Sequence, residues 1–163
     1  NDGFPSAVRL VRQLQDAATP EDGGPRFINN GDGTVTDSET GLMWKADDSY
    51  LELDKWVTWD EAKTYVQGLN RQYFATYTDW RMPTRKEVQT IFDPANPVTD
   101  NYGDTILLAP EFPPGAGQTC WTKTLHKTDK HLAIRFQFYN GDYRWHRMGL
   151  SSHGVRAVRL VKK

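Results

Sequence analysis

The chain has 163 residues with six Trp, seven Tyr and seven Phe, and a formal net charge of −1. This length fits one domain or one domain with a short appendage, and the Trp content at near-zero net charge argues against a disordered chain. The single cysteine, Cys120, excludes an intrachain disulfide and the zinc sites that need several cysteines, and no apolar run approaches the roughly 20 residues of a membrane span.

Residues 1–25 are predicted to form an N-terminal strand and linker, and residues 26–163 a domain. The linker assignment rests on the Pro-, Gly- and acid-rich run QDAATPEDGGP. AVRLVR at residues 7–12 recurs as AVRLVK at 157–162. Either the first copy ends a preceding copy of the same domain, which the linker favours, or both segments join one sheet and bring the termini together. Because neither an initiator Met nor a signal peptide is present, we expect a mature or excised segment.

The first predicted element after the linker is a β-hairpin, followed by a further strand, LMWKA. RFI, NNGDG and TVTD run over residues 26–37, and their Asn-Gly and Asp-Gly steps tolerate positive φ in a tight turn. The same loop resembles part of a calcium-binding loop, with Asn30, Asp32 and Glu39 at ligand positions of an EF-hand register. Ile28 would stand first in that register, where its side chain cannot ligate a cation, so a hairpin is favoured over a calcium site.

Two helices follow, each predicted from a capping box. TWDE at residues 58–61 starts an amphipathic helix of about three turns that reaches Asn70. TRKE at residues 84–87 starts a second helix, which Pro94 is expected to stop. Residues 93–118 hold five of the nine prolines and no sustained period, so we predict a long irregular loop.

The remaining elements are predicted strands. Residues 119–124 centre on Trp121, and residues 132–139 are joined to residues 143–148 by an Asn-Gly turn. A last strand covers residues 155–161. Two helices set between antiparallel strands and long loops indicate an α+β domain.

Five phrases appear in order along residues 26–161: RFINNGDGTVTDSETGLMW, TWDEAKTYVQGLN, DWRMPTRKEVQTIF, CWTKT and GVRAVRLV. Together they resemble the Lcl C-terminal domain family (domain of unknown function 1566), whose best-known member is the C-terminal domain of the Legionella collagen-like adhesin. Each phrase alone would be a weak signal, but their combination is specific.

The resemblance implies a C-type-lectin-like architecture, no cofactor and no accepted catalytic activity. It also implies a secreted bacterial protein that is extracellular or attached to the cell surface, with the periplasm as an alternative. Because this chain lacks a collagen-like repeat, the adhesin's binding of sulfated polysaccharides and its trimeric state carry over only as suggestions. Family members often end in VRCVR, whereas Ala157 stands there in this chain. Cys120 is therefore expected to be a lone buried thiol, and the paired-cysteine chemistry of the related formylglycine-generating enzymes is disfavoured.

The net charge hides an asymmetry along the chain. Residues 126–163 carry nine Lys or Arg and two Asp, a net of +7, whereas residues 1–125 carry a net of −8. Cations beside aromatic side chains suit a sulfated or acidic polysaccharide, because the cations pair with anionic groups and the aromatic faces stack on sugars. The alternative is that these strand faces are only solvated and balance the acidic part of the chain. The predicted ligand-binding residues are Arg144, Trp145, His146, Arg147, Tyr143 and Lys130.

The sequence predicts a non-enzymatic extracellular binding or adhesion module whose partner is a polysaccharide or a surface protein. Nucleic acid would exploit the same charges but is disfavoured for a surface protein. A second hypothesis is a structural assembly module, repeated in tandem and able to self-associate, which the AVRLVR repeat supports. A third, a hydrolase, requires a pocket that joins His153 or His146 to a nucleophile, and GLSSHG is not a nucleophile elbow. Zinc is disfavoured because no HExxH or His-x-His motif occurs.

The segment Asp79-Trp80-Arg81 is interpreted as structural rather than as part of a ligand pocket. We expect Trp80 to anchor the core, and Asp79 or Arg81 to pair with Arg156 or Glu87, because a buried unpaired charge costs several kcal/mol. The Trp residues inside the five phrases are expected in the core, and the other two are left for a surface. The first group is Trp44, Trp59, Trp80 and Trp121, and the second is Trp56 and Trp145.

Overall fold

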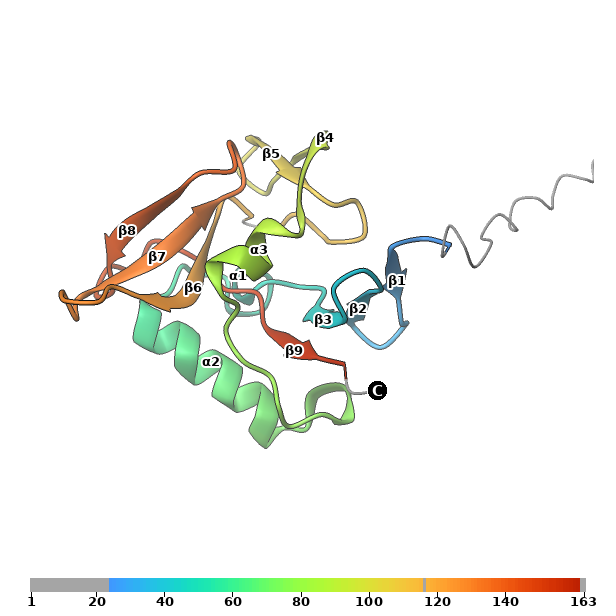
Figure 1. The fold of residues 1–163 in the computed structure, drawn as a ribbon, viewed down its shortest axis with the longest axis horizontal. Coiled ribbons are helices and arrows are strands. Elements are labelled where there is room, and N and C mark those ends of the chain that lie inside the picture. Colours follow the sequence, from blue (N-terminus) through green and yellow to red (C-terminus); the bar gives the residue numbers. More distant parts are fainter. Residues whose placement is uncertain (1–23, 116, 162–163) are drawn as a thin grey trace, which may run out of the picture.

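The computed structural model describes residues 24–115 and 117–161, which form three antiparallel sheets and three α-helices (Figure 1). The predicted α+β class is confirmed. The first AVRLVR copy and most of the predicted linker lie outside the described residues. The elements are β1 (Phe27–Asn29), β2 (Thr34–Asp37), β3 (Leu42–Lys45), α1 (Ser49–Leu53), α2 (Trp59–Arg71), a 3₁₀ turn (Phe74–Thr76), α3 (Arg85–Gln89), β4 (Phe92–Thr99), β5 (Thr105–Leu108), β6 (Thr119–Leu125), β7 (Leu132–Gln137), β8 (Tyr143–Arg147) and β9 (Val158–Leu160).

The first sheet has the strand order β1-β2-β3-β9 and contains the predicted hairpin. Its turn uses Gly31 and Gly33 at φ +80° and +89°, a region that side chains with a Cβ rarely adopt. The amide of Asn30 donates to the hydroxyls of Thr34 and Thr36, both at 2.8 Å. The second copy of the repeated segment supplies β9, which closes this sheet by pairing with β3.

Both predicted capping boxes are present, and each fixes where its helix begins. Thr58 caps α2 together with Glu61, and Thr84 caps α3 together with Glu87. Helix α2 buries an apolar stripe against the domain, as its spacing predicts. Helix α3 ends at Gln89, earlier than the prediction that Pro94 stops it, and the sequence analysis missed the short helix α1.

The predicted irregular loop over residues 93–118 is only partly correct, because β4 and β5 form a hairpin there (Figure 1). Among the described residues, strand β4 pairs with β5 alone, so its two prolines can place their missing N–H groups away from the ladder. The register shifts between Phe92 and Pro97, and the amide of Asn96 donates to the Leu108 carbonyl at 2.7 Å across that shift.

The core consists of two clusters, and large aromatic side chains lie in both. Trp44 is fully buried in the first, with its ring 6.4 Å from that of Phe112, whereas Trp80 and Trp121 are buried in the second. Trp59 is half-buried against the second cluster. The predicted core role is confirmed for Trp44, Trp80 and Trp121, whereas Trp59 lies at the edge of the core. Of the two Trp left for a surface, Trp145 is exposed and Trp56 is half-buried.

The Asp79-Trp80-Arg81 segment is held by two ion pairs, one of which differs from the prediction. Arg81 forms a two-point pair with Glu87, as expected, at 2.7 and 2.8 Å. Asp79 pairs not with Arg156 but with Arg159, whose Nε lies 2.6 Å from its carboxylate. Arg159 lies on β9, which bridges to Arg81 through the backbone of Val158, so the ion pair extends a strand contact.

Replacing Asp79 with Ala is expected to lower the free energy of unfolding by about 2 kcal/mol. The buried guanidinium of Arg159 would lose this carboxylate, but the Asp79 side chain is 42 % exposed, so water replaces part of the interaction. Chemical denaturation measures the change. The control is Lys55→Ala, which breaks an exposed pair with Glu61 and should cost less than about 0.5 kcal/mol. Equal losses in the two variants would contradict the structural role of Asp79.

Candidate functional site

The strand β8 carries five of the six predicted ligand-binding residues, and it divides them between two faces. Cross-strand pairing places Tyr143, Trp145 and Arg147 on one face, because side chains alternate along a strand and paired residues share a face. Arg144 and His146 therefore point to the other face. Arg144, Trp145 and Arg147 are exposed and His146 is half-buried.

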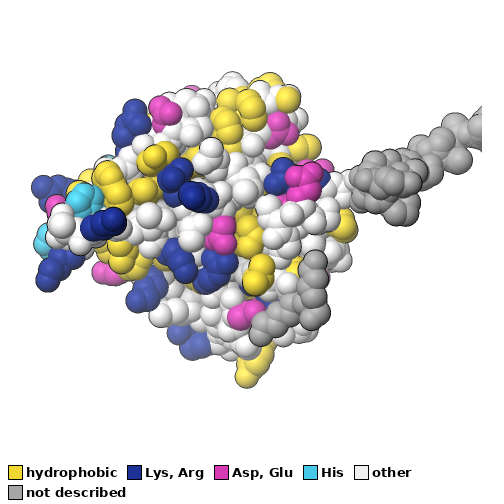
Figure 2. Space-filling model, viewed as in Figure 1, with side chains coloured by type: hydrophobic (Ala, Val, Ile, Leu, Met, Phe, Trp, Pro, Cys, Tyr) yellow, Lys and Arg dark blue, Asp and Glu magenta, His cyan; other side chains and the backbone are white. Residues whose placement is uncertain are grey.

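On the first face, exposed aromatic rings lie beside basic side chains. Tyr143 and Trp145 are 43 % and 42 % exposed. The guanidinium carbon of Arg85 lies 4.1 Å from the centroid of the Tyr143 ring, and the His126 ring lies 4.7 Å from that of Trp145. Figure 2 shows Lys, Arg and His side chains gathered at the left end of the molecule, where the β6–β7 turn and β8 lie in Figure 1.

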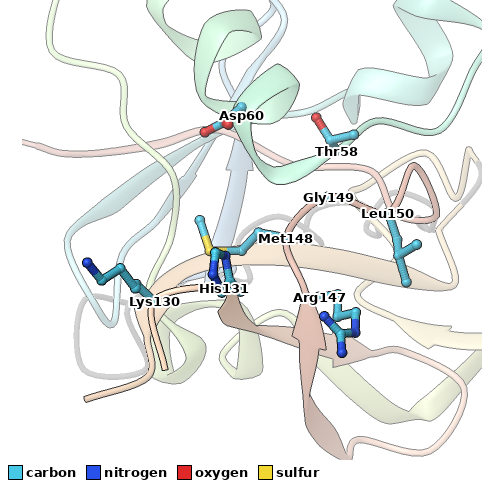
Figure 3. Close-up of a pocket in the computed structure, with 8 residues that line it drawn as sticks. All are labelled: Thr58, Asp60, Lys130, His131, Arg147, Met148, Gly149 and Leu150. Atoms are coloured by element: carbon cyan, nitrogen blue, oxygen red, sulfur yellow. The ribbon is translucent and has the colours of Figure 1, made fainter. Parts of the chain in front are cut away.

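Next to β8, an open cleft of about 680 Å³ is lined by both Arg147 and Lys130 (Figure 3). The start of α2 forms one wall, and the β6–β7 turn and the segment after β8 form the other. The backbone N–H of Trp59 donates to the Met148 carbonyl, and the N–H of Met148 donates to the His131 carbonyl, both at 2.9 Å, so the walls are tied together. The lining residues are Thr58, Asp60, Lys130, His131, Arg147, Met148, Gly149 and Leu150.

Opposite charges line the two walls of the cleft. Arg147 and Lys130 are exposed on one side, and Asp60 lies at the first turn of α2 on the other (Figure 3). Sequence reasoning named both cations, but it missed Thr58, Asp60 and the apolar floor around Met148, since helix α2 is remote from β8 in the sequence. This site can pair with an anionic group while contacting an apolar surface.

On the second face of β8, the half-buried His146 contacts the buried His153 of the following segment, a pair that sequence reasoning missed. His146 Nδ1 lies 2.7 Å from His153 Nε2, and His153 Nδ1 lies 2.7 Å from the Thr119 hydroxyl. The ring of His153 also packs edge-on against Trp121, with centroids 4.7 Å apart. His153 is only 2 % exposed.

The environment of the pair favours the neutral imidazoles. Burial, followed by His146 and Arg135, lowers the pKa of His153 to about 3. Burial and then Arg135 lower the pKa of His146. At neutral pH the pair therefore forms an uncharged hydrogen-bonded chain with Thr119, which fixes β8 to the segment after it. The Ser152 hydroxyl lies 3.3 Å from the same Nε2 that contacts His146.

The structure does not bring the calcium candidates into one coordination sphere. Asn30 donates from its amide nitrogen to two threonines, and Asp32 accepts hydrogen bonds from the N–H and hydroxyl of Thr34. Glu39 lies apart from them, 3.6 Å from Arg26. Across residues 24–115 and 117–161, no group of three His, Cys, Asp or Glu side chains is placed to hold a metal ion.

Cys120 is a buried free thiol, as predicted, and burial raises its pKa to about 12. A thiol with so high a pKa stays protonated at neutral pH and is a poor nucleophile. In the described part of the chain, no helix is long and apolar enough to cross a membrane.

The described residues form an α+β domain with an open cleft that is lined by charged and apolar side chains. The chain belongs to the Lcl C-terminal domain family, which matches residues 33–159. The resemblance noted in the sequence is therefore confirmed, and membership indicates an adhesin-like module of a secreted or surface protein. No curated protein matches the chain.

Proposed function

We propose that this domain is a non-catalytic extracellular binding module with a C-type-lectin-like architecture, and that its ligand is an acidic or sulfated polysaccharide. The observation that carries the proposal is that Lys130 and Arg147 line one cleft, and that Arg147 shares a face of β8 with the exposed rings of Tyr143 and Trp145. Family membership supports a surface location and an adhesive role.

Each part of this surface has a matching role toward a charged sugar. The guanidinium of Arg147 can form two parallel hydrogen bonds to a sulfate or carboxylate, and Lys130 adds a point charge. The rings of Tyr143 and Trp145 offer exposed apolar area on which sugar faces pack. The cleft lies within the usual size range of ligand pockets, roughly 300–1,000 Å³.

A hydrolytic role is less well supported by the same geometry. Both ring nitrogens of His153 are already occupied, by Thr119 and His146, and the Ser152 hydroxyl shares the nitrogen used by His146. A serine nucleophile needs a base free to take its proton and a third group that orients that base. This arrangement suits a structural histidine pair.

Retention on immobilised heparin tests the proposal. Arg147→Ala is expected to lower the salt concentration needed for elution, because Arg147 lines the cleft. Arg144→Ala should have a smaller effect, since Arg144 points to the other face of β8 and its Nη2 lies 3.6 Å from Asp142. The double variant Arg144→Ala/Arg147→Ala should show the full loss of heparin retention. The control is Arg71→Ala, which removes an exposed charge at the far end of α2. The same shift for Arg71→Ala and Arg147→Ala would refute a specific site.

A second function, structural assembly in tandem copies, is favoured by one observation. The segment at 157–161 contains β9, the strand that closes the first sheet, and the same five residues, AVRLV, stand at residues 7–11. Residues 7–12 therefore have the sequence of a closing strand from another copy. Sedimentation of the chain at low and high salt separates the two functions, because tight self-association indifferent to salt is expected only for assembly.

A further inference from the structure

A second hollow lies along α2, and it shares no lining residue with the cleft next to β8. It has a volume of about 230 Å³ and lies between α2, the segment over residues 80–82 and the exposed end of β6. Figure 2 shows Lys and Arg side chains gathered over the region where α2 lies in Figure 1. The lining residues are Trp59, Lys63, Val66, Gln67, Trp80, Arg81, Met82 and Lys123.

The floor of this groove is apolar and offers few polar groups to a ligand. Val66, Trp80 and Met82 are at least nine-tenths buried. The indole N–H of Trp59 already donates to the Thr122 carbonyl at 2.9 Å, and that of Trp80 donates to the Phe74 carbonyl at 3.1 Å. A sugar ring placed here would leave hydroxyl groups without partners, whereas an apolar side chain would not.

The rim of the groove is positively charged on both walls. Lys63 on α2 and Lys123 on β6 are exposed, and neither has an ion-pair partner among residues 24–115 and 117–161. Arg81 also lies at the rim, but its charge is matched by Glu87. The net excess of two positive charges therefore comes from the two lysines.

The length of the groove sets the size of its occupant. The helical wall runs from Trp59 to Gln67, which corresponds to roughly 12 Å at about 1.5 Å per residue. An extended chain advances roughly 3.3 Å per residue, so three to four residues span this wall. The apolar floor fits one large side chain, and acidic residues on either side of it would reach Lys63 and Lys123.

We propose that this groove binds an extended acidic peptide segment of a partner protein, in which one aromatic or large aliphatic residue is flanked by Asp or Glu. The apolar residue inserts between Trp59 and Met82, and the flanking carboxylates pair with the two rim lysines. The site is separate from the polysaccharide cleft and does not depend on it.

The test uses the full chain and a capped peptide with the sequence EDFDE, followed by isothermal titration calorimetry and by protein Trp fluorescence. Binding of EDFDE is expected, whereas EDGDE, which lacks the apolar residue, and KKFKK, which reverses the charge, should not bind. Lys63→Ala/Lys123→Ala should weaken EDFDE binding about tenfold, because two charge-assisted contacts are lost at a solvent-exposed rim. The charge-matched control, Lys55→Ala/Arg71→Ala, removes two exposed cations outside the groove and should retain the affinity.

Three outcomes would overturn the proposal. Equal binding of EDFDE and EDGDE would mean that only surface charge is recognised. Equal weakening by the rim variant and its control would mean that the groove is not the site. Displacement of EDFDE by heparin in the wild-type chain and in Arg147→Ala alike would mean that the groove is a general polyanion surface. Heparin retention in Lys63→Ala/Lys123→Ala is measured separately, so failure of this site is distinguishable from failure of the cleft.

Discussion

Trp121→Ala is expected to lower the free energy of unfolding by about 3–5 kcal/mol. Trp121 is fully buried, and its indole N–H donates to the Val57 carbonyl at 2.9 Å. Its ring also packs against His153 and His146, with centroids 4.7 and 6.0 Å away. Truncation would thus leave a cavity and an unpaired carbonyl in the cluster that supports both α2 and β8.

Urea denaturation monitored by far-ultraviolet circular dichroism measures this loss. Trp145→Ala is the matched control, because the same truncation at a side chain that is 42 % exposed should cost less than about 1 kcal/mol. If Trp121→Ala does not fold, Trp121→Phe keeps a ring in place and should cost about 1–2 kcal/mol. Similar stabilities for the variants at the two positions would show that Trp121 does not anchor the core.

Acidification from pH 7 to pH 5 is expected to lower the free energy of unfolding by about 2 kcal/mol through His153. The folded pKa of His153 is about 3, below its ordinary value of 6.5, so the unfolded chain binds a proton over this range that the folded chain does not. Stability from this group is therefore present above pH 6.5 and is lost progressively as the pH falls toward 3. Burial raises the pKa values of Asp37 and Glu87, but their hydrogen bonds and ion pairs with Arg26 and Arg81 lower them further than burial raises them. The stability that these carboxylates contribute is therefore lost at a still lower pH, where they become protonated.

His153→Phe separates this effect from general acid sensitivity. The variant should be less stable at pH 7, because the Thr119 hydroxyl and His146 lose their partner, and its stability should fall less than that of the wild type between pH 7 and pH 5, because only His146 still has a pKa lowered by burial and Arg135. His131→Gln, at an exposed position, should keep the wild-type dependence. Denaturation curves at half-unit pH steps give the slope of the free energy of unfolding against pH. If His153→Phe keeps the wild-type slope, the histidine pair is not the cause of the pH dependence.

Much of the fold could be predicted where local chemistry determines the structure. The turn glycines after Asn30, and the two threonine–glutamate capping boxes that begin with Thr58 and Thr84, specify their own elements without help from distant residues. The buried state of Cys120 was expected as well. In each case the signal lies within a few residues of the element it defines.

The rest depends on contacts between distant segments. The β4–β5 hairpin was missed because prolines normally break strands, and only the edge position of β4 accommodates them. Asp79 pairs with Arg159 because β9 lies beside the segment around Arg81, which nothing in the local sequence reveals. The histidine pair was missed because His146 and His153 lie on different segments.

The candidate cleft was predicted in part. Lys130 and Arg147 were chosen as basic residues near aromatic ones, and the structure brings them together. The alternation of side chains along β8 could have shown that Arg144 and His146 point away from Arg147, since a strand was already expected there. The opposite wall, at Thr58 and Asp60, required the tertiary fold.

The closing strand β9 has a consequence for how the chain folds. Trp44 on β3 pairs with Val158 on β9, so the first sheet joins segments from the two ends of the described domain. During synthesis, β1, β2 and β3 leave the ribosome early, and the outer edge of β3 has no ladder partner until nearly the whole domain has been made. Pairing at such long sequence separation makes folding slow, on the order of milliseconds to seconds. Among the strand pairings of the described domain, β3–β9 is therefore the last that can form, although the β1–β2 hairpin is synthesised well before it.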